Sequence, residues 1–164
     1  MVINPSRATR RSVILAMTGL VVGVGKPARS AEPTHLEGRW VLRTFINSTD
    51  PEEGFARLRF AASVMEVCFT SECDFFGSLT APTWQLNLSG TCDGERFTMR
   101  ATQGSVNTSD WQYDYVGWLA PRWPNASGQV LTFTGSCTRL SDYETPYGIA
   151  RAARVYSFIG VKLA

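Results

Sequence analysis

Regular alternation of apolar and polar residues is the feature that most constrains how this chain can fold. In the segment 82–102, PTWQLNLSGTCDGERFTMRAT, the apolar residues Trp84, Leu86 and Leu88 alternate with polar ones. Successive side chains of a β-strand point to opposite faces, so this pattern predicts a strand with one buried face and one solvent face. The same alternation dominates the chain after residue 30, and no helical stripe competes with it. The chain is therefore predicted to be all-β.

The turn inside this segment is Asp93-Gly94. An Asp-Gly pair is typical of the two-residue type I′ turn, because both residues tolerate the positive φ angles that this turn demands. The predicted pairs are Cys92 with Glu95, Gly90 with Phe97, Leu88 with Met99 and Leu86 with Ala101. The apolar residues of both strands then share one face, which predicts a β-hairpin with Cys92 in the buried phase.

The other predicted strands are short and closely spaced. They cover 38–47, 55–69 (one long bent strand or two), 74–79, 110–119, 128–140 and 150–163. Glycine, proline, asparagine and aspartate occupy the connections, as turns require. About eight strands in this arrangement predict an antiparallel up-and-down β-barrel, because closure leaves no exposed sheet edge.

The first thirty residues have the order of an export signal. A basic start that includes Arg10 and Arg11 precedes the uncharged apolar run 13–25, and small residues follow at Ala28 and Ser30. This order predicts a cleaved signal peptide, since the run is shorter than the roughly 20 residues that span a bilayer. The segment 9–15, TRRSVIL, resembles a twin-arginine signal, which implies a bacterial host and export of the folded protein. An ordinary Sec signal is the alternative.

Removal of residues 1–30 would leave one domain, residues 31–164, and would change the charge of the chain. The whole chain has 16 basic and 14 acidic residues, and five basic but no acidic residues lie in the signal. A mildly acidic domain with the single lysine Lys162 has no basic footprint for nucleic acid. The predicted location is periplasmic or extracellular, without a membrane association after signal removal.

The four cysteines all lie after the signal. An even number in an exported chain predicts disulfide bonds, with free buried thiols as the alternative. Cys68 and Cys73 flank the short stretch FTSE, which suits a clasp across a hairpin and leaves Cys92 to pair with Cys137. No metal site is predicted, because there is no C-x-x-C spacing and His35 is the only histidine.

The segment 36–40, LEGRW, carries a resemblance. A Gly-x-Trp at the start of the first strand resembles the calycin-type barrels, that is, lipocalins and avidins. The resemblance implies that Trp40 packs over one end of the barrel against an arginine from near the last strand. Arg151 is the expected partner, in a cation–π contact. Separately, the segment 113–163 resembles a group of uncharacterised exported bacterial proteins, which implies no activity.

No catalytic apparatus or cofactor site is predicted. His35 lies in the lead-in to the first strand, and the chain has neither a Gly-x-Ser-x-Gly elbow nor a phosphate-binding glycine loop. Asp110 and Asp114 share a strand phase and bracket two aromatic residues, an arrangement that sugar-cleaving enzymes use. Exposed strand residues give the same pattern. A barrel enzyme that uses these carboxylates or a buried tyrosine therefore remains an alternative.

The segment 110–125, DWQYDYVGWLAPRWPN, is the candidate ligand site. Trp111, Tyr113 and Tyr115 share one strand face, and Trp123 lies in a proline-rich loop. The three rings on the shared face can fill a small barrel, line a cavity for a small apolar or aromatic ligand, or form an exposed surface for a protein partner. The sequence favours an exported, non-catalytic binding barrel, with the barrel enzyme and a filled interaction module as alternatives.

Overall fold

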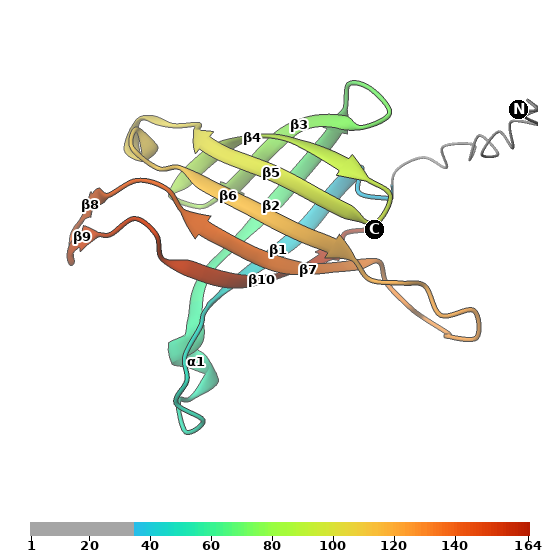
Figure 1. Ribbon diagram of the computed structural model, residues 1–164, viewed down its shortest axis with the longest axis horizontal. Helices are drawn as coiled ribbons and strands as arrows, with labels where there is room; N and C mark the ends of the chain where they lie inside the picture. The colour runs from blue at the N-terminus through green and yellow to red at the C-terminus, as the bar shows by residue number, and fades with distance from the viewer. Residues whose placement is uncertain (1–34) are drawn as a thin grey trace, which may run out of the picture. The chain divides into compact units, whose positions relative to one another are not determined.

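The computed structural model describes residues 35–164, and these form an eight-stranded antiparallel barrel. The wall strands are β1 (Gly38–Ile46), β2 (Arg59–Phe69), β3 (Asp74–Ala81), β4 (Trp84–Asp93), β5 (Arg96–Gln103), β6 (Tyr113–Leu119), β7 (Thr132–Arg139) and β10 (Val155–Lys162). Each strand pairs with the next along the chain, and β10 closes the barrel against β1 (Figure 1). The predicted fold class is confirmed.

Three segments outside the barrel wall were not predicted. A four-residue helix, α1 (Phe55–Leu58), replaces the start of the expected strand 55–69, and a short 3-10 helix, η1 (Val106–Thr108), lies between β5 and β6. The chain between β7 and β10 forms a small separate hairpin from β8 (Tyr143–Thr145) and β9 (Gly148–Ala150). We call residues 140–154 the strap. The last wall strand therefore begins at Val155 rather than at Ala150.

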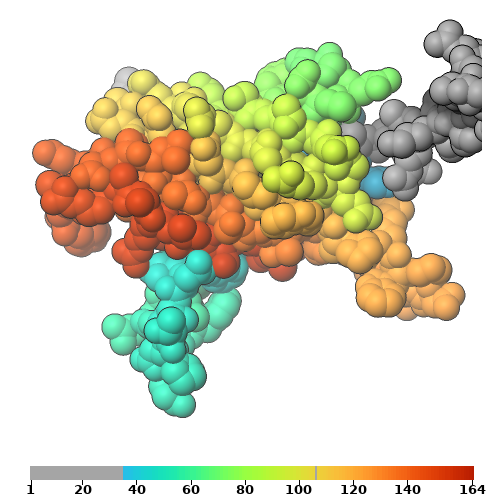
Figure 2. Space-filling model, viewed as in Figure 1, coloured from blue at the N-terminus to red at the C-terminus, as the bar shows by residue number. Residues whose placement is uncertain are grey.

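The up-and-down topology gives the barrel two chemically different ends. The strap end carries the strap together with the β1–β2, β3–β4 and β5–β6 connections. The Trp40 end carries the start of β1 and the other three connections, including the long β6–β7 loop. Figure 2 shows that this loop and the β1–β2 connection both project from the body of the barrel.

The register of the β4–β5 hairpin differs from the prediction by two residues. Cys92 lies opposite Phe97 and Gly90 lies opposite Met99, so the loop residues are Gly94 and Glu95. Gly94 has a φ of 61°, and Glu95 has no positive φ. This is the pattern of a type II′ turn, in which glycine takes the first loop position. A register shift of two residues keeps each side chain on the same face of the sheet, so Cys92 is buried as predicted.

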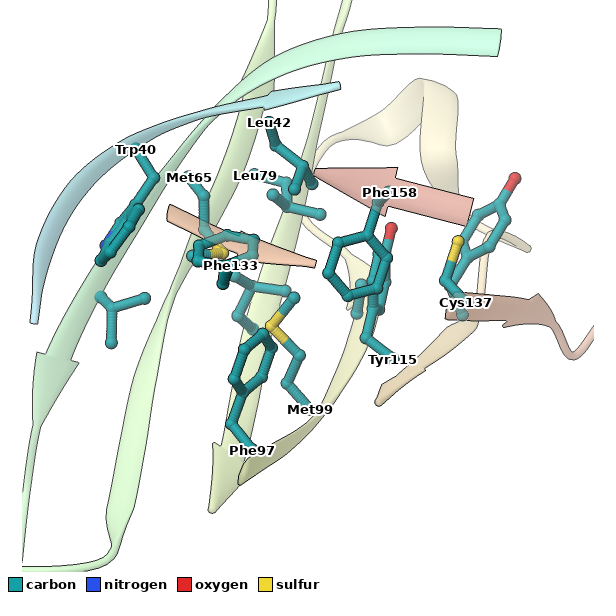
Figure 3. Packing of buried hydrophobic residues seen from close by; sticks show 14 of the residues in the cluster. Trp40, Leu42, Met65, Leu79, Phe97, Met99, Tyr115, Phe133, Cys137 and Phe158 are labelled. Carbon is teal, nitrogen blue, oxygen red and sulfur yellow. The ribbon is translucent and has the colours of Figure 1, made fainter. Parts of the chain in front are cut away.

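A column of aromatic rings fills the barrel from end to end (Figure 3). The ring centroids of Trp40 and Phe133 are 4.7 Å apart, and Phe133 lies 5.9 Å from Phe158. Tyr115 follows at 5.5 Å from Phe158, and Tyr113 at 6.4 Å from Tyr115. Such tilted and edge-on pairs contribute about 0.5–1.5 kcal/mol each beyond area burial.

Glycines on neighbouring strands make room for four phenylalanine rings. The cross-strand pairs are Phe75 with Gly90, Phe97 with Gly117, Phe158 with Gly135 and Phe133 with Gly160. A Cβ atom added at any of these glycines would meet the ring of its partner at 2.0–2.6 Å. The rings therefore lie against bare backbone, a known device for registering curved sheets. This packing leaves the middle of the barrel filled.

The four cysteines are free thiols, so the predicted pairings are wrong. Cys92 lies on β4 and Cys137 on β7, and β5 and β6 separate them. A disulfide needs Cα atoms within about 7 Å, less than the width of three strand spacings. Cys68 lies on the outer face of β2, whereas Cys73 continues the inward phase of β3, so their side chains diverge.

Trp40 closes its end of the barrel, but its cationic partner differs from the expectation. The Trp40 side chain is fully buried, and its Nε1–H donates to the Leu36 carbonyl at 2.8 Å. Lys162 of β10 places its Nζ 5.4 Å from the Trp40 ring. Arg151 lies in the strap at the other end and forms an exposed ion pair with Asp142. The physical reason is that Arg151 precedes β10 instead of starting it.

The predicted signal peptide, residues 1–30, lies outside the described residues. Between residues 35 and 164, no helix has the length and apolar character needed to cross a membrane.

Candidate functional site

The strap end contains a buried arginine, Arg139, the last residue of β7. Its alternating phase continues inward from Phe133 and Cys137, so its side chain enters the barrel, and only 4% of it is exposed. Burial of a charged side chain is costly unless the charge is compensated. The groups that compensate the buried charge of Arg139 therefore define this end of the barrel.

Four aromatic rings surround the Arg139 guanidinium. Its Cζ lies 4.9 Å from the ring centroid of Tyr143, 5.4 Å from Tyr156, 5.8 Å from Phe60 and 5.9 Å from Tyr113. These distances are in the range of cation–π attraction, which strengthens when the site is desolvated. The rings come from β2, β6, the strap and β10, so the cluster forms only when the barrel closes. We call these five residues the arginine–tyrosine cluster.

The hydrogen bonds of Arg139 all go to neutral acceptors. Its Nη1 donates to the carbonyl of Arg151 at 3.0 Å, its Nη2 to the Tyr156 hydroxyl, and its Nε more weakly to the Tyr113 hydroxyl at 3.4 Å. The Tyr113 and Tyr143 hydroxyls lie 2.7 Å apart. In the described part of the chain, no carboxylate lies within ion-pair distance of this guanidinium.

The tyrosine hydroxyls and the cysteine thiol near Arg139 stay neutral and cannot offset its charge. Burial raises the pKa of Tyr113, and the hydrogen bond with Tyr143 raises it further. Burial also raises the pKa values of Tyr115 and Tyr156. For Cys137, burial raises the thiol pKa to about 12, although a hydrogen bond with Tyr115 and the charge of Arg139 oppose the shift. At neutral pH these groups are therefore protonated.

A β-bulge brings Phe60 into the cluster. The β1–β2 ladder pairs Thr44 with Ala61 but Phe45 with Arg59, which leaves Phe60 as an extra residue on β2. A bulge bends the strand and re-aims the side chains around it. Phe60 consequently stacks on Tyr156, with ring centroids 4.1 Å apart, although 38% of Phe60 remains exposed. It is the most accessible member of the cluster.

The strap covers the cluster, and one carboxylate within the strap ties its two arms to each other. Asp142 Oδ2 accepts from Arg151 Nη1 at 2.8 Å, and Asp142 Oδ1 accepts from the Ala152 amide. The Ala152 amide and then Arg151 lower the pKa of Asp142, and the charge of Arg139 is a minor contribution. Ala153, where the strap returns to the wall, has a φ of 62°, a conformation that costs energy for a residue other than glycine.

Trp84 and Trp111 extend the aromatic surface beyond the cluster. The Trp111 ring stacks on Tyr143 with centroids 4.8 Å apart, and Trp84 lies 5.9 Å from Trp111. Both tryptophans are only partly buried. Their indole rings give this end an accessible fluorescent reporter next to Tyr143.

A pocket of about 280 Å³ lies beside α1 near the same end. It is lined by Arg43, Thr44, Phe45, Phe55, Arg59 and Ala61. Among the described residues, neither of its arginines lies within ion-pair distance of a carboxylate. Two of the lining residues flank the cluster residue Phe60 in sequence. The pocket thus combines cationic and aromatic side chains next to the cluster.

The structure separates the predicted ligand residues. Tyr113 and Tyr115 are buried with exposed fractions of 4% and 6%, and Trp111 is partly buried. Their shared face therefore points into the barrel, where the rings contribute to the filled core. Trp123 lies in the β6–β7 loop at the opposite end and is 71% exposed. Only Tyr113 and Trp111 belong to the strap end, and no contact joins them to Trp123.

The carboxylates considered for a barrel enzyme lie outside the barrel interior. Asp114 faces outward on β6 and accepts two hydrogen bonds from Arg100, at 2.7 and 2.8 Å. The hydrogen bond from Arg100 lowers the pKa of Asp114, whereas a general acid in a cavity needs a raised one. Asp110 is exposed before β6, where its side chain accepts from Ser109. The two do not form a pair that faces a common pocket.

The sequence analysis missed Arg139, Tyr143, Tyr156 and Phe60. One signal was available, because Arg139 continues the apolar phase of Phe133 and Cys137 in the predicted strand 128–140. A charged residue at a position where the alternation predicts burial needs a partner for its charge, so such a position is a candidate site. Tyr143 gave no such signal, since β8 is too short for an alternation to show.

Comparison of the chain with known protein families, curated proteins and solved structures found no match. The geometry of the strap end is therefore the basis for the function proposed below.

Proposed function

We propose that this chain is a non-catalytic, calycin-type binding barrel whose ligand is a small anion with an apolar body. The ligand binds at the strap end, where its anionic group meets Arg139 and its body contacts Phe60, Trp111 and the adjoining pocket. The observation that carries the proposal is the buried Arg139 guanidinium, which has aromatic neighbours and neutral acceptors but no carboxylate within ion-pair distance in residues 35–164.

The filled interior supports a site at the barrel end instead of a deep cavity. Phe133 and Phe158 are each 1% exposed, and glycine backbone lies directly beneath their rings. An anion at the strap end would form charge-assisted hydrogen bonds with a guanidinium whose side chain is only 4% exposed before the anion binds. Entry requires Tyr143 and the Arg151 carbonyl to move with the strap. The ion pair of Arg151 with Asp142 joins the two arms of the strap at the surface, and the Leu140 amide donates to the Gln112 carbonyl at 2.8 Å just before β6.

Binding of dodecanoate tests this function. We expect dodecanoate to quench the fluorescence of Trp111 and Trp84, and we expect dodecan-1-ol, which has the same apolar chain, to bind more weakly. Arg139→Met should weaken dodecanoate binding roughly 10–100-fold, the value of a hydrogen bond to a charged group. The affinity for dodecan-1-ol should not change. Fluorescence titration of both probes, with circular dichroism to verify folding, measures these effects.

Two further variants make this test decisive. Arg100→Met removes an arginine of equal charge from the outer face of β5 and should leave dodecanoate binding intact. Asp142→Asn removes the ion pair between the two arms of the strap and a negative charge that acts on Arg139, so it should tighten dodecanoate binding. Equal affinities of the native chain for dodecanoate and dodecan-1-ol, or loss of binding in Arg100→Met alone, would contradict an anion site at Arg139.

A protein-interaction module is the second candidate function. The filled core favours it, and apolar side chains stand on the outer faces of β6 and β10, the two strands that flank β7. Trp118 on β6 and Ile159 and Val161 on β10 have exposed fractions of 47%, 40% and 37%. Exposed apolar patches of this kind mark partner surfaces. A native chain that binds neither dodecanoate nor dodecan-1-ol would favour this second function.

We also propose that the barrel works outside the cytoplasm after cleavage behind residue 30. The order of basic, apolar and small residues in the segment 1–30 supports this location. The expected result is that the exported chain, expressed in a bacterium, has the denatured mass of residues 31–164. Replacing both Arg10 and Arg11 with lysine should leave the uncleaved chain inside the cell. Recovery of full-length chain from the exported fraction would contradict the proposal.

A further inference from the structure

Cys73 and Cys92 lie directly opposite each other at the Trp40 end of the barrel. The β3–β4 ladder pairs Asp74 with Thr91, and one further step in the same register pairs Cys73 with Cys92. The Cys92 amide donates to the Cys73 carbonyl at 2.7 Å, which is one of the two hydrogen bonds of a directly opposed antiparallel pair. Directly opposite residues of such a hydrogen-bonded pair have Cα atoms about 5.5 Å apart.

The two side chains also occupy the same face of the sheet. Cys73 continues the phase of Phe75 and Leu79, which are buried on β3, and Cys92 continues the buried phase of Leu86 and Leu88 on β4. A disulfide requires a Cα separation of about 4.4–6.8 Å and side chains on one face. The opposed positions and the shared face of Cys73 and Cys92 are what these conditions require, whereas neither Cys68 nor Cys137 lies opposite another cysteine.

From this juxtaposition we propose that Cys73 and Cys92 are a thiol pair that oxidises to a disulfide between β3 and β4. The bond would staple the β2–β3 loop to the wall of the barrel. It differs from both pairings that the sequence suggested. The inference does not depend on the proposed ligand function, because Arg139 and the strap lie at the other end of the barrel.

The chemistry is a thiol–disulfide exchange with an external disulfide as the oxidant. The exposed Cys73 thiolate attacks one sulfur of that disulfide and expels its other sulfur as a thiolate. The Cys92 thiolate then attacks the Cys73 sulfur of the mixed disulfide and releases the second thiol. Two electrons and two protons pass from the cysteine pair to the co-reactant. Cys73 reacts first because it is exposed, whereas Cys92 is only 3% exposed and burial raises its thiol pKa.

The end of the ladder offers room for this change. The Cys73 amide does not pair with β4 but donates to Ser71 Oγ at 3.3 Å, and the Cys92 thiol makes a weak bond to the Gly94 carbonyl at 3.3 Å. Oxidation therefore breaks no hydrogen bond between β3 and β4. Residues 70–73 form an exposed loop, in which the Cys73 side chain can turn toward Cys92.

The positions of the glutamates allow the Cys73–Cys92 disulfide to be identified within a single proteolytic peptide. Cleavage after Glu66, Glu72 and Glu95 places Cys68 in the peptide 67–72 and both Cys73 and Cys92 in the peptide 73–95. The full chain is equilibrated with oxidised glutathione, quenched in acid, alkylated in denaturant and cleaved. We expect the peptide 73–95 to lack alkyl groups and to weigh two hydrogens less than its reduced form. The peptide 67–72 should be alkylated.

Matched serine variants decide the outcome. Cys73→Ser and Cys92→Ser should each abolish the two-hydrogen loss, whereas Cys68→Ser should retain it. Oxidation should raise the midpoint of thermal unfolding by roughly 5–15 °C in the native chain and in Cys68→Ser only. A doubly alkylated peptide 73–95, a stable glutathione adduct on Cys73, or a cross-link from the peptide 67–72 or from Cys137 would overturn the pairing.

Discussion

Replacing Trp40 with alanine is expected to lower the free energy of unfolding by about 3–5 kcal/mol, a large part of the 5–15 kcal/mol that a domain of this size has. Trp40 is fully buried, packs on Phe133 and supplies a hydrogen bond to Leu36. Its removal leaves a cavity at one end of the ring column and an unpaired carbonyl. Urea unfolding followed by circular dichroism measures the loss.

Two comparisons show whether the loss comes from packing at this end. Trp118→Ala removes the same side chain from the outer face of β6, where it is 47% exposed, and should cost less than about 1 kcal/mol. The affinity of Trp40→Ala for dodecanoate should match that of the native chain below its unfolding transition. A variant that keeps its stability but loses dodecanoate binding would show that Trp40 acts at the ligand site instead.

The sequence was sufficient for the fold class because alternation depends on local geometry. Strand number, antiparallel order and barrel closure follow from short alternating segments that are joined by turn residues, and the structure confirms them. The sequence determined the register of the β4–β5 hairpin less completely than it determined the fold class. Asp93-Gly94 and Gly94-Glu95 both place a glycine where a tight turn needs positive φ, and both put the same residues on the buried face.

Contacts between distant strands could not be derived from the sequence. Phe133 meets Gly160 and Phe158 meets Gly135 only because β10 pairs with β7, across the strap. Without knowledge of that register, a glycine inside a strand indicates only a position that weakens the strand. For the same reason the odd-numbered aromatics of the segment 110–119 left three interpretations open. The structure resolves the orientation of Tyr113 and Tyr115, which pack inside the barrel, while a role in ligand binding stays a prediction.

The candidate site was harder to predict than the fold. The residues around Arg139 come from β2, β6, the strap and β10, and one of them, Phe60, is placed by a bulge. Sequence analysis concentrated on Trp111, Tyr113, Tyr115 and Trp123 because aromatics are conspicuous in a short segment. An arginine at a position that alternation assigns to the buried face is a less conspicuous signal. Arg139 is such a residue, and it lies at the centre of the arginine–tyrosine cluster.

The Phe–Gly pairs make a counter-intuitive prediction for Gly160. Alanine normally stabilises a glycine position by reducing the entropy of the unfolded chain, yet Gly160→Ala should destabilise the barrel by about 1–3 kcal/mol. The new Cβ would lie 2.0 Å from Cζ of Phe133. That ring cannot move aside, because Trp40, Phe97 and Phe158 pack around it. Urea unfolding of the purified variant measures the effect.

Gly54→Ala provides the control and Phe133→Leu provides the rescue. At Gly54 the backbone has a φ of −62° and an added Cβ meets nothing within 4 Å, so alanine there should be neutral or slightly stabilising. Phe133→Leu shortens the ring that clashes. If the clash is the cause, the double variant Gly160→Ala/Phe133→Leu will lose less stability than the sum of the single variants, by about 0.5–3 kcal/mol. Strictly additive losses would mean that the Phe133 ring does not lie against Gly160, which would contradict the Phe–Gly packing of the core.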